Sequence, residues 1–154
     1  MKAIILALMV LLAWPAHAAE PWLQQAMLAE VNAIRARAGR APLSLDARLS
    51  RAALAHSIDM LNTTRMSHTG RDGSDPGRRI TRVGYGWRSY RENVGAGYQD
   101  LREAMSGWMN SPGHRDNILA AEVTQVGLGF AAGPGMMQGN VPRLFWTMVL
   151  AAPR

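Results

Sequence analysis

Three polar residues in separate segments have the chemistry to bind a divalent metal ion. His68 lies in a polar loop after a predicted helix, and His114 is at the third helical position after a Ser111-Pro112 start. The positive end of a helix disfavours a charged imidazole, so we expect His114 to be neutral. Glu92 lies in a glycine-rich strand, where β structure does not require a carboxylate. Two neutral imidazoles and a carboxylate suit zinc and leave a position open for water, while the spacing alone fits scattered polar residues equally well.

A third histidine of the expected exported chain has a different setting. His56 lies on the apolar face of a predicted helix, where a histidine is more often a hydrogen-bonded core residue than a ligand. Ser67 and Ser111 adjoin the other two histidines. Neither is a clear nucleophile, because Ser111 is better interpreted as the N-cap of the helix that follows it.

The elements that must position these residues follow from periodicity and capping. Apolar residues recur at helical spacing in the first half of the chain, and capping residues precede most of these segments. The predicted helices are 21–38, 46–64 with Asp46 as N-cap, 75–83 beginning at Asp75-Pro76, one after Asp100 and one after Ser111-Pro112. The predicted strands are a bent strand within 84–98 and a late pair, 124–132 and 143–152, joined by a Gly/Pro/Met-rich hairpin. Early helices and late paired strands indicate an α+β fold with helices on a mainly antiparallel sheet.

Residues 1–18 are predicted to be a signal peptide. Lys2 precedes an unbroken apolar run of 11 residues. As a helix this run would span about 16 Å, which is too short to cross a bilayer core of about 30 Å. A proline then ends the run, and small residues allow cleavage between Ala18 and Ala19. We therefore expect an exported protein, secreted or periplasmic, with no transmembrane anchor.

The composition favours one globular domain, from 19 to 154 with its core at about 23–151. The chain of 154 residues has no cysteine, which excludes a disulfide, a zinc ribbon and a thiolate enzyme. Its 17 Lys+Arg exceed 11 Asp+Glu, for a net charge of +6, which suits an anionic cell envelope and, on arithmetic alone, nucleic acid. The arginines are scattered rather than striped, so we expect no nucleic-acid partner.

The order of several short motifs resembles the bacterial branch of the CAP superfamily, which includes cysteine-rich secretory proteins, insect venom antigen 5 and plant pathogenesis-related 1 proteins. The motifs are His68-Thr69-Gly70, Gly84-Tyr85, Arg91-Glu92-Asn93-Val94, the run from Trp108 to Arg115, Asn117-Ile118-Leu119 and Val126-Gly127-Leu128-Gly129. The resemblance covers essentially the whole exported chain, and SPGHRDNIL is its most specific part.

This resemblance implies a three-layer α-β-α sandwich, the CAP/SCP fold, with a surface cleft lined by two histidines and acidic residues. By motif, His68 and His114 are the two histidines and Glu92 is the acid; the supporting residues are Ser67, Asn93, Trp108, Ser111 and Asn117. Eukaryotic members carry a second glutamate shortly after the tryptophan of the third helix, and residues 108–111 contain no acid. A divalent cation such as zinc, held by His68, His114 and Glu92, is therefore expected to bind weakly.

Two classes of function remain open from the sequence. The favoured class is an extracellular, monomeric module that binds a metal ion or a small ligand, such as a lipid or an envelope component, without established catalysis. The alternative is a metal-assisted hydrolase of peptides or envelope polymer, in which the histidines hold a water and Glu92 acts as base or ligand.

Overall fold

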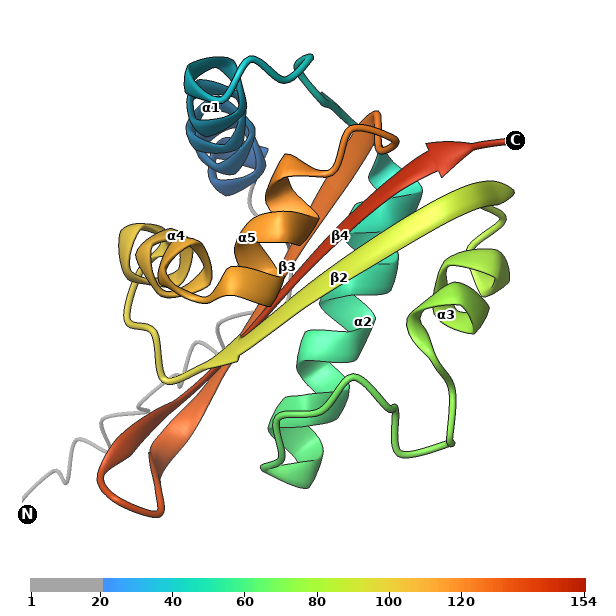
Figure 1. The fold of residues 1–154 in the computed structure, drawn as a ribbon. Helices are drawn as coiled ribbons and strands as arrows, with labels where there is room; N and C mark the ends of the chain where they lie inside the picture. Colours follow the sequence, from blue (N-terminus) through green and yellow to red (C-terminus); the bar gives the residue numbers. More distant parts are fainter. Residues whose placement is uncertain (1–20) are drawn as a thin grey trace, which may run out of the picture.

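The computed structural model describes residues 21–154, and in this part of the chain five helices surround a four-stranded sheet (Figure 1). The helices are α1 (Pro21–Arg37), α2 (Ala47–Thr63), α3 (Pro76–Arg82), α4 (Leu101–Asn110) and α5 (Pro112–Leu119). The strands are β1 (Ser44–Leu45), β2 (Trp87–Ala96), β3 (Gln125–Met137) and β4 (Val141–Pro153). The predicted signal peptide and its cleavage site lie outside the described residues. None of the helices between 21 and 154 has the length and apolar character needed to cross a membrane.

The sheet has the order β1-β3-β4-β2. The β3–β4 and β4–β2 pairs are antiparallel, and the short β1 pairs with β3 in parallel, so the predicted mainly antiparallel sheet is confirmed. Both late strands are longer than predicted, because the ladder resumes after a register shift between Ala132 and Met136. Only residues 138–140 turn the chain between them.

The two faces of the sheet are covered by different helices (Figure 1). Helices α1, α4 and α5 lie on one face, and α2 and α3 lie on the other. Successive side chains of a strand point to opposite faces. Accordingly, Met148 and Leu150 of β4 join the core under α1, α4 and α5, whereas Val149 and Ala151 join the core under α2 and α3. The arrangement is the expected α-β-α sandwich.

Helix α2 lies unusually close to β3. A Cβ atom placed on Gly127 would meet the backbone of Leu49 and Ser50, and one on Gly129 would meet the backbone of Ala53 and Leu54. These two strand positions therefore require glycine, because only a residue without a side chain lets the helix backbone rest directly on the strand.

Aspartates cap three of the helices as predicted. The side chain of Asp46 accepts hydrogen bonds from the first turn of α2, that of Asp75 from α3, and that of Asp100 from α4. These bonds satisfy backbone N–H groups that have no partner inside the helix. The cap at Asp75 also sets where α3 begins, and α3 supplies an arginine to the site described below.

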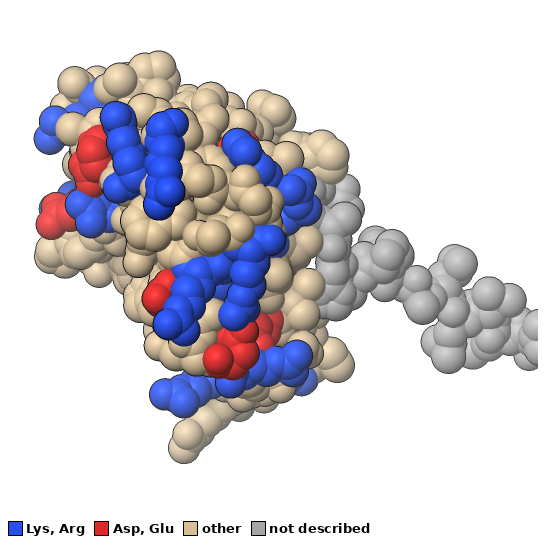
Figure 2. Space-filling model, turned by 90° about the vertical axis from the view of Figure 1, so that its right-hand side faces the viewer, with Lys and Arg blue, Asp and Glu red and all other residues tan. Residues whose placement is uncertain are grey.

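Arginines and acidic side chains are mixed over the surface. On the face in Figure 2, which is the right-hand side of Figure 1, basic and acidic groups adjoin one another instead of forming a patch of one sign. Exposed ion pairs among the described residues include Arg82–Asp72 and Arg91–Glu122, and Arg71 pairs with the half-buried Asp59. Basic and acidic side chains are therefore interspersed on the face that Figure 2 shows.

Candidate functional site

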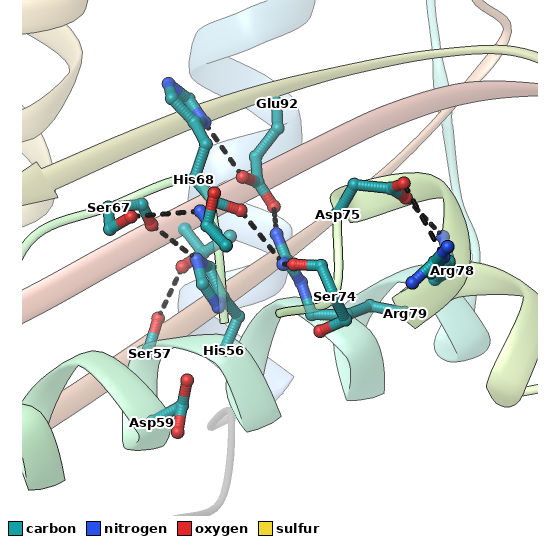
Figure 3. A network of polar contacts seen from close by, with 12 residues as sticks. His56, Ser57, Asp59, Ser67, His68, Ser74, Asp75, Arg78, Arg79 and Glu92 are labelled. Atoms are coloured by element: carbon teal, nitrogen blue, oxygen red, sulfur yellow. Dashed lines mark hydrogen bonds and ion pairs between the residues drawn. The ribbon is translucent and has the colours of Figure 1, made fainter. Parts of the chain in front are cut away.

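The centre of the site is the buried carboxylate of Glu92 on β2. Its side chain is only 2% exposed, yet both oxygens have charged or polar partners. Nδ1 of His68 lies 2.9 Å from Oε1, and a guanidinium nitrogen of Arg79 donates to Oε2 at 2.6 Å (Figure 3). A buried carboxylate is tolerated when it is paired and hydrogen-bonded in this way. Glu92 thus joins β2 to α3 and to the loop before it.

The bond to Glu92 determines which part of His68 faces outward. The His68 side chain is 54% exposed. Because a carboxylate oxygen accepts the bond, Nδ1 carries a proton, and Nε2 is left as the ring nitrogen that can meet a ligand. A carboxylate behind a histidine fixes the ring orientation in the same way at metal and catalytic sites.

Arg79 is the residue that sequence analysis missed. It is buried, and it also donates to the backbone carbonyls of His68 at 3.0 Å and Ser74 at 2.8 Å. Helix α3 contains further arginines, and nothing local in the sequence distinguishes Arg79 from Arg78 or Arg82. The only available signal was indirect: a buried glutamate needs a counter-charge from somewhere in the fold.

His114 reaches the same region from α5. The Asn93 side chain on β2 donates to the His114 carbonyl at 3.0 Å, and the Asn117 side chain donates to the Asn93 side chain and to the Glu92 carbonyl. Burial lowers the pKa of His114, and the charge of His68 lowers it further. The imidazole is therefore neutral at pH 7, as expected from the sequence, but burial is the main cause of the lowered pKa.

The supporting residues Trp108 and Ser67 make hydrogen bonds that fix the backbone around the site. The indole nitrogen of the fully buried Trp108 donates to the Val94 carbonyl at 3.0 Å. The Ser67 hydroxyl accepts a bond from the Thr69 N–H, and the Ser67 carbonyl accepts one from His56. His56 is 1% exposed, which confirms the prediction that it is a core histidine.

The predicted cap at Ser111 is wrong. Ser111 occupies the N-cap position of α5 with an extended backbone, but its side chain makes no capping bond. Its backbone N–H instead closes α4 on the Trp108 carbonyl, and Pro112 at the helix start presets the first turn without help from the hydroxyl.

We therefore expect Ser111→Ala to change the free energy of unfolding by less than about 0.5 kcal/mol, whereas a working cap contributes about 1 kcal/mol. Urea unfolding followed by circular dichroism measures the change. Asp100→Ala, which removes a cap bond that is present, serves as the positive control. A loss at Ser111 as large as the loss at Asp100 would show that the hydroxyl does cap α5.

Glu92 does not fit the role of a metal ligand in this arrangement, because both of its oxygens already have partners. Between residues 21 and 154, no group of three or more His, Cys, Asp or Glu side chains is arranged to hold a metal ion. Of the three predicted ligands, His68 and His114 keep imidazole nitrogens for that purpose. Metal binding stays a prediction, and it now depends on these two residues.

Comparison with known proteins places the chain in a family. The model of the cysteine-rich secretory protein family, CAP, matches residues 28–150. The chain is 34% identical over 99 residues to the uncharacterized protein YkwD of Bacillus subtilis (strain 168), covering 64% of this chain and 38% of YkwD. It therefore spans about two fifths of that relative's length.

Two solved structures are also similar. An extracellular protein containing an SCP domain from Bacillus anthracis str. Ames is 28% identical with a TM-score of 0.72, over 84% of this chain and 40% of that one. An outer surface protein of Borrelia burgdorferi has a TM-score of 0.72 at 18% identity, over 84% of this chain and 92% of that one, and so shares the fold. Because the family model covers most of the described residues, the chain belongs to the cysteine-rich secretory protein (CAP) family.

Proposed function

We propose that this protein is an exported CAP-domain module, secreted or periplasmic, that binds a divalent cation or small polar ligand through His68 and His114. The observation that carries the proposal is the bond between His68 Nδ1 and buried Glu92, which leaves Nε2 of an exposed imidazole to meet a ligand. The lowered pKa of His114 supports it, because only a neutral imidazole can act as a ligand.

Glu92 acts in this proposal as a positioning residue. It orients His68 and does not contact the ligand, since Arg79 and His68 occupy its oxygens. Zinc sites that keep a position open for water usually have three protein ligands. Two imidazoles supply only two, so the affinity for zinc is weak. The same contacts disfavour the hydrolase alternative, because a buried, paired carboxylate is a poor general base.

A lipid or envelope component would have a separate place to bind. A groove of about 740 Å³ lies between α1 and the start of α4, and its apolar lining includes Trp22, Leu101, Phe130 and Trp146. Trp22 is 66% exposed, and an exposed aromatic beside an apolar groove is typical of ligand-binding surfaces.

Zinc titration by calorimetry tests the proposal. We expect wild-type protein to bind Zn²⁺ weakly at pH 7, and His68→Ala and His114→Ala to lose that binding while their apo melting temperatures change little. Glu92→Gln should weaken binding by about 10–100-fold, the usual effect of losing a carboxylate behind a ligating histidine. Asp116→Ala, an exposed acid on α5 near His114, is the matched control and should bind as wild type does.

The proposal fails if wild-type protein shows no histidine-dependent heat and both histidine variants melt several degrees lower without metal. In that case the side chains only tie the loops together.

A further inference from the structure

A pocket of about 410 Å³ lies between α3 and the first residues of β2, and we call it the α3–β2 pocket. Its volume is within the usual range for small-molecule sites. The lining has two kinds of surface: the aromatic rings of Trp87 and Tyr90 on β2, and a mostly polar part from α3 and its N-cap residue. The part from α3 and its cap consists of Asp75, Gly77, Arg78, Thr81 and Arg82.

The α3–β2 pocket is separate from the candidate site around Glu92. Arg79 extends from α3 toward Glu92, whereas Arg78 of the same helix extends toward Asp75 (Figure 3). Neither His68 nor His114 lines the pocket. An inference about this pocket therefore does not rest on the metal-binding proposal.

The aromatic part of the lining is a rigid corner. The ring centroids of Trp87 and Tyr90 are 4.6 Å apart, and the two ring planes meet at 84°. The indole N–H of Trp87 donates to the Thr81 hydroxyl oxygen at 3.0 Å and to the Gly77 carbonyl at 3.3 Å. Because these contacts hold the rings in place before a ligand arrives, binding costs less ordering of the protein.

The charged groups of the pocket are exposed and keep hydrogen-bonding capacity. The side chains of Asp75, Arg78 and Arg82 are 57%, 70% and 59% exposed. Oδ1 of Asp75 accepts the capping bond from the Arg78 backbone N–H, but Oδ2 lies 3.9 Å from Nε of Arg78, which is too far for a hydrogen bond. Oδ2 is thus an available acceptor and the Arg78 guanidinium an available donor. Arg82 is paired with Asp72, so the charges of both signs nearly balance.

A pyranose sugar has the surfaces that fit this lining. Its C–H groups form a flat apolar face that stacks on an aromatic ring, and the hydroxyls around its edge both donate and accept hydrogen bonds. A simple anion would use only the arginines, and an aliphatic chain would use neither the acid nor the arginines. We propose that the α3–β2 pocket binds a neutral saccharide. The C–H face of one sugar ring lies in the corner of Trp87 and Tyr90, and its hydroxyls bond to Asp75 and Arg78.

Cellotetraose tests the proposal, because it is a neutral oligosaccharide whose ring substituents are all equatorial. In an NMR titration of the exported chain, we expect saturable shifts of the Trp87 indole N–H signal and of the amides in residues 75–82 and 87–90. Inorganic sulfate probes attraction of anions to the arginines, and we expect it to leave the Trp87 indole signal unchanged.

Two variants remove one kind of contact each. Tyr90→Leu keeps an apolar side chain but removes the ring, and it should weaken cellotetraose binding by about tenfold. Asp75→Asn keeps a good N-cap residue but puts an amide N–H₂ where Oδ2 accepts. Loss of a hydrogen bond to a charged group should weaken binding by about tenfold as well. Asp75→Asn tests the proposal even if Tyr90→Leu does not fold.

Two controls localise the effect. Trp22→Leu removes an exposed aromatic residue outside this pocket and should bind cellotetraose as wild type does. His68→Ala should also bind it as wild type does, so failure of the zinc proposal and failure of this one are distinguishable.

Absence of saturable shifts would overturn the proposal, and so would shifts that disappear in Trp22→Leu but persist in a folded Tyr90→Leu protein. If sulfate reproduced the shifts seen with cellotetraose, charge attraction to the arginines would explain them and the saccharide assignment would be wrong.

Discussion

Replacing Arg79 with methionine is expected to destabilise the protein by about 3–5 kcal/mol, the usual cost of removing one partner of a buried ion pair. The arginine and glutamate side chains are 10% and 2% exposed, so water cannot replace the lost guanidinium. The change also removes the bonds to the His68 and Ser74 carbonyls. Urea unfolding at pH 7 measures the effect, and we expect zinc affinity to fall with it because the His68 loop loses its anchor.

Two further variants separate the buried pair from a general effect of losing an arginine. Arg91→Met breaks the exposed pair with Glu122, whose side chains are 47% and 40% exposed, and should cost no more than about 1 kcal/mol. The double variant Arg79→Met/Glu92→Leu removes both buried charges and should recover part of the lost stability. If Arg79→Met cost no more than Arg91→Met, the buried pair would not be the support of this site.

Gly129→Ala is expected to have an equally large effect on the same face of the sheet, where α2 packs against β3. The new methyl group would collide with the α2 backbone at Ala53 and Leu54. Overpacking costs about 1–3 kcal/mol when side chains can adjust, and here a helix backbone must move. We expect a loss of at least about 3 kcal/mol and a displaced α2, visible as a fall in melting temperature and in native amide dispersion.

Gly86→Ala is the control, because a Cβ at that position meets nothing within 4 Å. It should change stability by less than about 0.5 kcal/mol. A Gly129→Ala protein as stable as Gly86→Ala would mean that α2 does not rest on β3 at this point.

The main elements could be predicted from the sequence because their signals are local. Asp46, Asp75 and Asp100 precede helical segments and do cap them. The long apolar run of β4 reflects burial on both faces of a central strand. By contrast, the two-residue β1 forms only by pairing with the distant β3, and the outer part of the β3–β4 ladder forms only beyond a register shift. The sequence of either segment alone does not predict such pairing.

The candidate site divides in the same way. The sequence by itself determined that Glu92 is a carboxylate in a strand that does not require one. It also determined that His68 lies in a polar loop after a helix, and that His114 lies in the first turn of another helix. Only the tertiary structure decided that Glu92 faces inward to His68 and Arg79, residues 24 and 13 positions away. Helix capping and hydrophobic periodicity depend on residues that are close together in the sequence, so the sequence alone reveals them. The partner of a buried charge depends on how whole helices and strands pack together, and the residues next to that charge in the sequence do not indicate which partner it will have.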